Sequence, residues 1–274
     1  MYILIINIIA VLFLSVAVIF PAVFFIPNLS AEFLRSVWPM AVLAVLALAC
    51  MNIYFFKNRR LFDLLKREDW PALADYLEKK VYKDGKFSTR NVKLLAHSYF
   101  VLGDFSAVAR LEDKTTAVKP VLLDEFALIF GSARLLGGNS ADAAEFFKTR
   151  LENGKINNSQ RKQWLCWFYG FSLLISGSYD KARVVFGELV LNANDGIITG
   201  LSAYILSETL GKRPLANEEC QNQAKKGVEK VWMEIKTLDI WKRKAEKVQT
   251  EIHGAVIKNK ITEAGEWLFK KEIS

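Results

Sequence analysis

Two long runs of apolar residues open the chain. No charged side chain interrupts residues 1–31 or residues 36–56. At 1.5 Å per residue, a helix over residues 2–26 would extend about 37 Å, and one over residues 36–56 about 31 Å, enough for a hydrocarbon core of roughly 30 Å. The pattern predicts a transmembrane hairpin over residues 1–56, with spans at residues 2–26 and 36–56.

The charges beside the two runs indicate their orientation. The connection between them carries one basic residue, Arg35, whereas a basic cluster follows the second run. Lys and Arg are enriched in cytoplasmic loops, so we expect a bacterial inner-membrane protein with its N-terminus and everything after residue 56 in the cytoplasm. A cleaved signal sequence is the alternative, although the first run has no basic residue and exceeds a signal core of about 7–15 residues. The predicted membrane-surface basic cluster is Lys57, Arg59, Arg60, Lys66 and Arg67.

A repeated helical pattern occupies residues 57–213. In each copy an apolar helix with a small residue at its middle leads into a tight turn, and the next helix carries a small residue followed by a bulky one four positions later. The clearest copy has Gly170, Gly177, Ala182 and Phe186 at these positions. Such a helix pair leaves an apolar face exposed, so the pairs are expected to stack.

The turns of the pattern recur at a regular interval. They fall at residues 68, 103, 138 and 177, which are 35, 35 and 39 residues apart. The third copy repeats the small and bulky positions with Gly131, Gly138, Ala143 and Phe147. With the first turn at Glu68, the second span would continue unbroken into the first repeat helix, which predicts a stiff junction.

These landmarks resemble the tetratricopeptide repeat (TPR) family over about residues 53–191. We call the contact between the two helices of a pair the seam. The sequence departs from the family at two positions: Glu68 replaces the turn glycine, and Val108 replaces the alanine that packs in the seam. The resemblance implies an all-α, right-handed solenoid of antiparallel helix pairs whose concave face binds peptides or helices. A helical array without a ligand is the alternative. The layout also resembles, in architecture only, the bacterial membrane-hairpin TPR proteins associated with haem biosynthesis.

In such arrays the first helix of each pair lines the concave face. Each first helix has a side that points away from its partner helix. This side is polar in the early repeats and strongly apolar in the later ones, and large apolar surfaces are seldom left in water. We therefore expect the apolar end to be covered. The predicted partner-binding groove is Lys93, His97, Phe100, Trp167, Phe171, Leu174, Leu201 and Tyr204, with Ser132 and Leu135 between them.

Residues 214–274 are predicted to form C-terminal capping helices. Apolar residues recur at three- and four-residue steps from Gly227 to His253, which predicts one long amphipathic helix, and again over residues 255–271. Three roles are open: these helices cap the array, they leave the groove to a partner's amphipathic helix, or the last helix returns to the bilayer through Trp267 and Phe269.

Composition serves mainly to exclude other functions. The 274 residues include only two His and three Cys, too few for an elaborate metal site. Contact with an anionic membrane explains the net charge of +8. The sequence contains no phosphate-binding loop, dinucleotide fingerprint, nucleophile elbow or metal-binding His pair. The basic run at residues 242–244 alternates with acidic residues, which favours a solvated face over nucleic-acid binding. We expect Cys50, Cys166 and Cys220 to be free.

Together these features predict a protein that is not an enzyme and that needs neither a metal nor a cofactor. The predicted function is a membrane-anchored adaptor or scaffold that binds other proteins at the cytoplasmic face. The alternative is a non-catalytic accessory subunit of a membrane enzyme or transport complex, with contacts made through the transmembrane hairpin.

Overall fold

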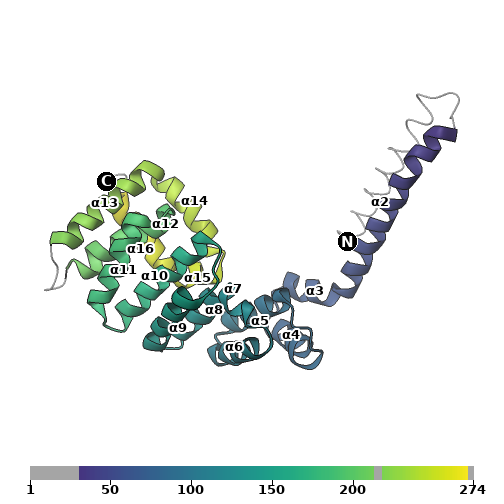
Figure 1. The fold of residues 1–274 in the computed structure, drawn as a ribbon, viewed down its shortest axis with the longest axis horizontal. Coiled ribbons are helices and arrows are strands. Elements are labelled where there is room, and N and C mark those ends of the chain that lie inside the picture. The colour runs from purple at the N-terminus through teal and green to yellow at the C-terminus, as the bar shows by residue number, and fades with distance from the viewer. Residues whose placement is uncertain (1–30, 213–217, 271–274) are drawn as a thin grey trace. The chain divides into compact units, whose positions relative to one another are not determined.

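The computed structural model describes residues 31–212 and 218–270, and within these residues it contains helices and no strand (Figure 1). The all-α prediction is confirmed. The chain forms two compact units, residues 1–69 and residues 70–274.

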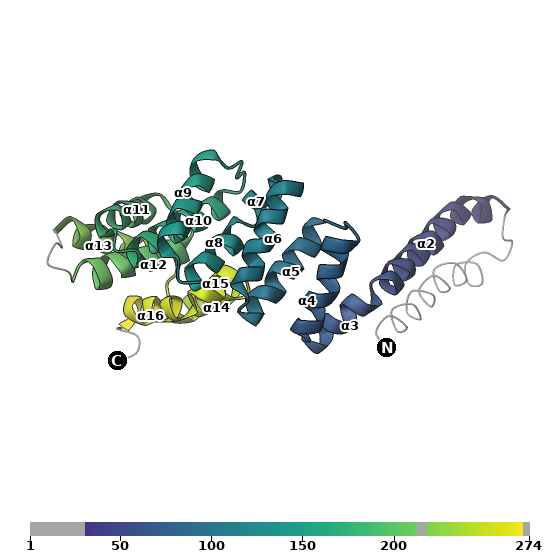
Figure 2. The same cartoon turned by 90° about the horizontal axis from the view of Figure 1, so that it is seen from below.

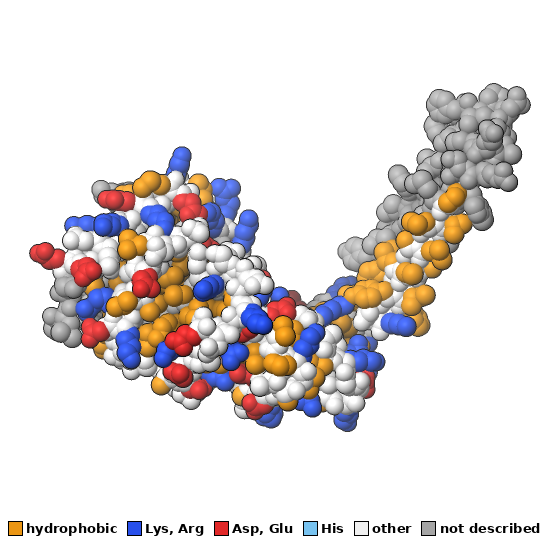
Figure 3. All heavy atoms as spheres, viewed as in Figure 1, with side chains coloured by type: hydrophobic (Ala, Val, Ile, Leu, Met, Phe, Trp, Pro, Cys, Tyr) orange, Lys and Arg blue, Asp and Glu red, His pale blue; other side chains and the backbone are white. Residues whose placement is uncertain are grey.

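The described part of the first unit contains α2 (Ala31–Lys57) and α3 (Arg59–Arg67). Helix α2 includes the second predicted span, residues 36–56, whereas the first, residues 2–26, lies outside the described residues. Apolar side chains lie along the visible surface of α2 (Figure 3). Among the described residues, no helix meets the combined length and apolarity required to cross a membrane.

The predicted unbroken junction between the second span and the first turn is wrong. Helix α2 ends at Lys57 and α3 begins at Arg59, with Asn58 between them. The Asn58 side-chain Nδ2 donates to the Tyr54 carbonyl at 2.9 Å. The backbone of Asn58 leaves the helical region, with φ −107° and ψ 10°, and this interrupts the helix.

The second unit starts with α4 to α9. Two of its short segments, η1 here and η2 later in the chain, are π-helical. The elements are α4 (Trp70–Glu78), η1 (Lys79–Lys83), α5 (Thr89–Leu102), α6 (Phe105–Val118), α7 (Val121–Glu125), α8 (Ala127–Leu136) and α9 (Ser140–Asn153).

The remaining helices complete the array and then turn back on it. They are α10 (Ser159–Ile175), α11 (Tyr179–Asn192), α12 (Gly196–Tyr204), η2 (Ile205–Leu210), α13 (Glu218–Glu234), α14 (Leu238–Gln249), α15 (Ile252–Val256) and α16 (Lys258–Leu268).

The four predicted turns are confirmed. Glu68, Gly103, Gly138 and Gly177 all adopt positive φ, at 53°, 70°, 83° and 83°. Glycine does this without steric cost, whereas Glu68 holds the left-handed conformation as a non-glycine residue at the C-cap of α3. The regular spacing in the sequence therefore reflects helices that all end in the same way.

The predicted seams are also present. Helices α8 and α9 pack together, as do α10 and α11. A Cβ atom at Gly131 would clash with the Phe147 ring, and one at Gly170 would lie 3.1 Å from Cζ of Phe186. Small residues at mid-helix thus let the bulky side chain of the partner helix approach the backbone.

The C-terminal helices fold back onto the array. We call residues 238–268, which form α14, α15 and α16, the C-terminal strap. Its α16 packs against α12 and its α15 against α8, so the strap lies along one side of the array (Figure 2). The prediction of one long helix over residues 227–253 is wrong, because Thr237 caps a new helix by accepting a hydrogen bond from the Ile240 N–H at 3.4 Å.

The seam makes a quantitative prediction. Gly131→Ala should lower the free energy of unfolding by about 2–3 kcal/mol, because the new methyl group meets the Phe147 ring directly. Gly170→Ala is the control and should cost less, since its nearest contacts begin at 3.0 Å and allow small shifts. Urea denaturation followed by circular dichroism measures both. Addition of Phe147→Leu should offset part of the Gly131→Ala loss; equal, additive losses would contradict this account of the seam.

Candidate functional site

The C-terminal strap is seated by one tryptophan. Trp241 of α14 is buried, and its Nε1 donates to the Ile261 carbonyl at 3.2 Å. A Cβ atom at Gly200 of α12 would lie 2.7 Å from the indole, and one at Gly265 of α16 would lie 2.5 Å from it. The indole therefore fits between two helices only because both positions lack a side chain.

Polar contacts hold the far end of the strap on the array. The Tyr204 hydroxyl donates to Glu263 at 2.9 Å, and the Trp267 Nε1 donates to Glu208 at 3.1 Å. Burial, followed by the hydrogen bond to Glu263, raises the pKa of Tyr204 to about 12. The hydrogen bond from Lys260 is the main cause that lowers the pKa of the Glu263 carboxyl. These groups thus keep the protonation states that the contacts require at neutral pH.

His253 anchors the other end of the strap. Its ring lies 5.2 Å from the Trp164 ring and 6.1 Å from the Phe168 ring, measured between centroids. Burial lowers the pKa of His253 to about 4, and Glu251 opposes this only in part. His253 is therefore a neutral packing residue against α10.

Two predicted groove residues are core residues instead. Trp167 and Leu201 are fully buried. The Trp167 ring stacks on Phe171 at 5.1 Å and meets Phe186 of α11 edge-on at 6.0 Å. The prediction that these two side chains present themselves to a partner is wrong, because Trp167 belongs to the α10–α11 seam and Leu201 to the core beneath the strap.

The structure separates the remaining predicted groove residues. Lys93 is exposed, while His97 and Phe100 on the same helix are half-buried. The His97 ring lies 5.3 Å from Trp70, and burial, aided by Lys93, lowers its pKa. On later helices Leu135, Phe171, Leu174 and Tyr204 are half-buried against the core, and Ser132 is buried. Of the eight predicted groove residues, Lys93 alone is exposed.

The residues that actually face the strap on α10 are Trp164 and Phe168. The sequence contained a signal for this face, because Trp164 and Phe168 are four residues apart and therefore share a side of the helix, and both rings lie near His253 of the strap. The seam residue Gly170, two positions beyond Phe168, lies on another side. On α12, Gly200 faces the strap, since a Cβ atom there would lie 2.7 Å from the Trp241 ring.

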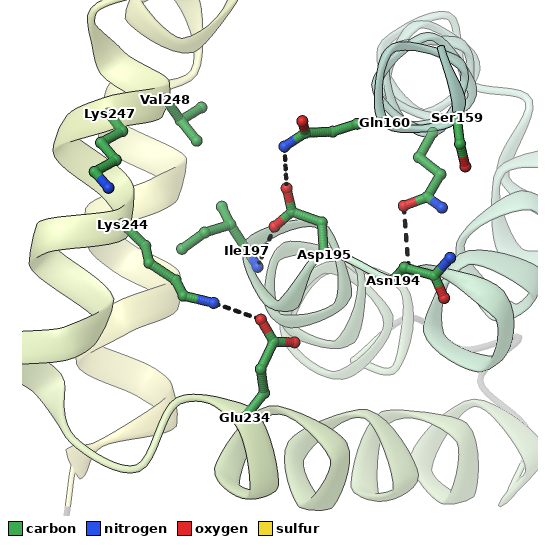
Figure 4. Close-up of a pocket in the computed structure, with 10 residues that line it drawn as sticks. Ser159, Gln160, Asn194, Asp195, Ile197, Glu234, Lys244, Lys247 and Val248 are labelled. Carbon is green, nitrogen blue, oxygen red and sulfur yellow. Dashed lines mark hydrogen bonds and ion pairs between the residues drawn. The ribbon is translucent and has the colours of Figure 1, made fainter. Parts of the chain in front are cut away.

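An open trough remains between the strap and the array. Figure 4 shows its larger part, a hollow of about 530 Å³ between α14 and the N-terminal ends of α10 and α12. Asp195 accepts hydrogen bonds from the Gln160 side chain and from the Ile197 N–H, both at 2.9 Å, while Lys244 pairs with Glu234. The hollow is lined by Ser159, Gln160, Gln163, Asn194, Asp195, Ile197, Glu234, Lys244, Lys247 and Val248.

A second hollow, of about 330 Å³, adjoins the first. The two share Gln160, Lys247 and Val248, and we call them together the inner-face trough. The second hollow adds apolar surface and charges of both signs, and it contains one residue of the predicted groove. Its other lining residues are Lys93, Glu125, Phe126, Leu128, Ile129, Asn158, Arg161, Trp164, Glu251 and His253.

The trough offers binding chemistry of a mixed kind. Hydrogen-bond donors and acceptors, cations, carboxylates and apolar side chains all reach its surface. Within the described residues, no group of three or more His, Cys, Asp or Glu side chains is placed to hold a metal ion. The three cysteines are free in the structure. The arrangement can therefore make hydrogen bonds, ion pairs and apolar contacts with a ligand.

Comparisons with known proteins concern the part of the chain that contains the trough. Residues 107–270 match a family described as "Uncharacterised Treponema protein". An "Uncharacterized protein" of Treponema pallidum (strain Nichols) is 33% identical over 163 residues, which cover 60% of this chain and 51% of the relative. The match thus spans about half the length of that relative. No solved structure matches the chain.

The His253 contacts predict that acid weakens the strap. The pKa of His253 is near 6.5 in the unfolded chain and about 4 in the fold, so the unfolded state takes up a proton first as the pH falls below 6.5. At pH 5 this proton uptake should lower the free energy of unfolding by about 1–2 kcal/mol relative to neutral pH, and the decrease levels off below pH 4. Hydrogen exchange of residues 252–268 between pH 7.5 and pH 5 measures it. His253→Phe should remove this part of the pH dependence; an unchanged profile would contradict the assignment.

Proposed function

The chain belongs to the family described as "Uncharacterised Treponema protein", and we propose that it is a membrane-anchored, TPR-like adaptor that captures a segment of another protein in the inner-face trough. The single observation that carries the proposal is the open trough, with its mixture of charged, polar and apolar side chains, beside an inner face that is otherwise filled. All of its lining residues except Lys93 lie within the region that matches the family.

The repeated turns and seams support the TPR-like part of the proposal. Positive φ at Gly103, Gly138 and Gly177 ends the first helix of three successive pairs. Phe147 and Phe186 occupy equivalent places against the seam glycines of their own pairs. A right-handed stack of antiparallel helix pairs is the architecture that such a repeat builds in the TPR family.

The dimensions of the trough favour a short segment as the ligand. The strap already fills the part of the inner face that would receive a helix, whose diameter with side chains is about 10–12 Å. The two hollows of about 530 and 330 Å³ leave room for a few residues in an extended or loop conformation. Charges of both signs and the apolar side chains would then fix the register of that segment, with Lys247 and Val248 at its middle.

The apolar surface of α2 and the charge distribution support membrane anchoring. Leu43 is 71% exposed and Leu46 is 60% exposed, and a row of exposed leucines on one helix is expected in lipid and seldom in water. The basic cluster after residue 56 favours an orientation in which the N-terminus and the array are cytoplasmic. A tether of this kind would raise the local concentration of the trough near its membrane partners.

The same exposed surface of α2 favours a second candidate function. An accessory subunit of a membrane enzyme or transport complex would use Leu43 and Leu46 for contacts with another membrane helix. Replacement of residues 1–56 by an unrelated hairpin separates the two candidates. An adaptor should keep its partner after the exchange, whereas an intramembrane subunit should lose it.

Site-specific photocrosslinking in intact membranes tests the proposed function. A photoreactive phenylalanine analogue in place of Gln163, which lines the trough, should give a discrete adduct with another protein. The matched control places the analogue at Val184, which is 60% exposed and does not line the trough.

Charge reversal sharpens the crosslinking experiment. Lys247→Glu should reduce the Gln163 adduct by about tenfold, since loss of a charged contact with its partner costs roughly 1.5–3 kcal/mol. Lys181→Glu, on the exposed surface of α11, should leave the adduct unchanged. Adducts of equal yield from positions 163 and 184, or an adduct insensitive to Lys247→Glu, would contradict binding in the trough.

A further inference from the structure

We propose that the bend between α2 and α3 binds anionic phospholipid at the membrane surface. We call residues 52–63 the elbow. In this proposal its aromatic side chains lie at the boundary of the acyl chains, and its cations contact lipid phosphates. The inference rests on the proposed membrane anchoring and adds a lipid class and a binding place to it.

The elbow contains a hollow of about 610 Å³ within the first unit. The interruption at Asn58 creates it, because the chain changes direction there instead of continuing as one straight helix (Figure 1). One wall is aromatic and the rim is charged. The lining residues are Asn52, Ile53, Phe55, Phe56, Lys57, Arg59, Phe62 and Asp63.

The aromatic wall is ordered, yet it presents a large apolar surface. The Phe55 and Phe62 rings lie 5.3 Å apart, and Tyr54 lies 6.3 Å from Phe62. Beside them Phe56 is 79% exposed and Ile53 is 55% exposed. Tyr54 is 47% exposed, and Tyr at the end of an apolar helix is typical of the headgroup region of a membrane.

The charges on and beside the rim complement an anionic leaflet. Two cations, Lys57 and Arg59, and one carboxylate, Asp63, line the hollow, and residues 57–67 as a whole contain five cations and no other carboxylate. The Arg59–Asp63 ion pair is 3.9 Å long and both side chains are largely exposed, so it neutralises little of this charge. Lys57 and Arg59 border the aromatic wall, where long basic side chains can place their stems on apolar surface and their charges on phosphates.

Continuity with α2 favours lipid over an acidic protein as the occupant. The apolar side chains along α2 lead directly into the elbow (Figure 3), and the cations begin where that apolar surface ends. A lipid leaflet has the same order of chemistry, with hydrocarbon followed by phosphate. An acidic protein would complement the cations and leave Ile53 and Phe56 uncovered.

Lipid retention by the full chain tests the proposal. The protein is reconstituted in vesicles of equal parts phosphatidylcholine and phosphatidylglycerol, extracted gently, and analysed by native mass spectrometry for the lipid classes that remain bound. The wild type should retain an excess of phosphatidylglycerol. The double variant Lys57→Gln, Arg59→Gln should reduce that excess by about fivefold or more, given the usual effect of one cation near an anionic leaflet.

A matched double variant separates a defined site from general electrostatic attraction. Lys66→Gln, Arg67→Gln removes the same charge from the C-terminal end of α3, outside the hollow. These two cations can attract the leaflet without holding a lipid in the hollow, so their loss should lower the phosphatidylglycerol that survives extraction by at most about twofold. Equal losses in both double variants, or no phosphatidylglycerol excess in the wild type, would overturn the proposal.

Failure of membrane anchoring would be recognised separately. Carbonate extraction of cell membranes should leave the wild type and both double variants in the pellet. Release of all three would refute the anchor, and flotation with phosphatidylglycerol or phosphatidylcholine vesicles would then test the elbow alone. In that case too, equal flotation with phosphatidylglycerol and phosphatidylcholine vesicles would overturn the elbow proposal.

Discussion

The second unit depends on covering the apolar inner side of its helical array. Helices that stack as repeated pairs leave such a face exposed, and a chain in water must cover it. The C-terminal strap does so through Trp241, which fits between Gly200 and Gly265 because neither has a Cβ atom. Two glycines and one indole therefore decide where the strap lies, and the strap decides which part of the inner face stays open.

This arrangement explains why the candidate site differs from the groove expected from the repeats. Trp167 and Leu201 are core residues, and the open surface lies at the helix ends, where α10 and α12 begin opposite α14. The trough is consequently lined by polar and charged side chains as well as apolar ones. In the second unit the apolar residues mainly stabilise the fold, while polar residues at helix starts are available for recognition.

The sequence predicted the repetitive part of the fold well, because repetition there is local. Turns at Glu68, Gly103, Gly138 and Gly177 and the Gly131–Phe147 seam follow from short-range spacing. The sequence indicated that the C-terminal helices cover the array, but it did not indicate where they lie on it. In a sequence, a glycine that packs against a distant tryptophan cannot be told from a glycine that packs within a repeat. The trough left no signal, because its walls join residues from Lys93 to His253 that share no periodicity.

The proposed activities fall in different parts of the chain. The region that matches the family, residues 107–270, contains the strap and nearly all of the trough, whereas the apolar α2 and the elbow precede it. On this account the family region recognises a protein segment and the N-terminal region binds the membrane. Neither role requires covalent chemistry, and each rests on a different set of side chains.

Hydrogen exchange on a chain that ends at residue 237 tests most directly whether the strap completes the core. Without Trp241 and its neighbours, the inner side of α10 and α12 is open to water. The account predicts that amide protection of these two helices falls by orders of magnitude while α5 and α6 keep theirs. Full protection of α10 and α12 in the shortened chain would show that the array is stable alone, and it would contradict the account.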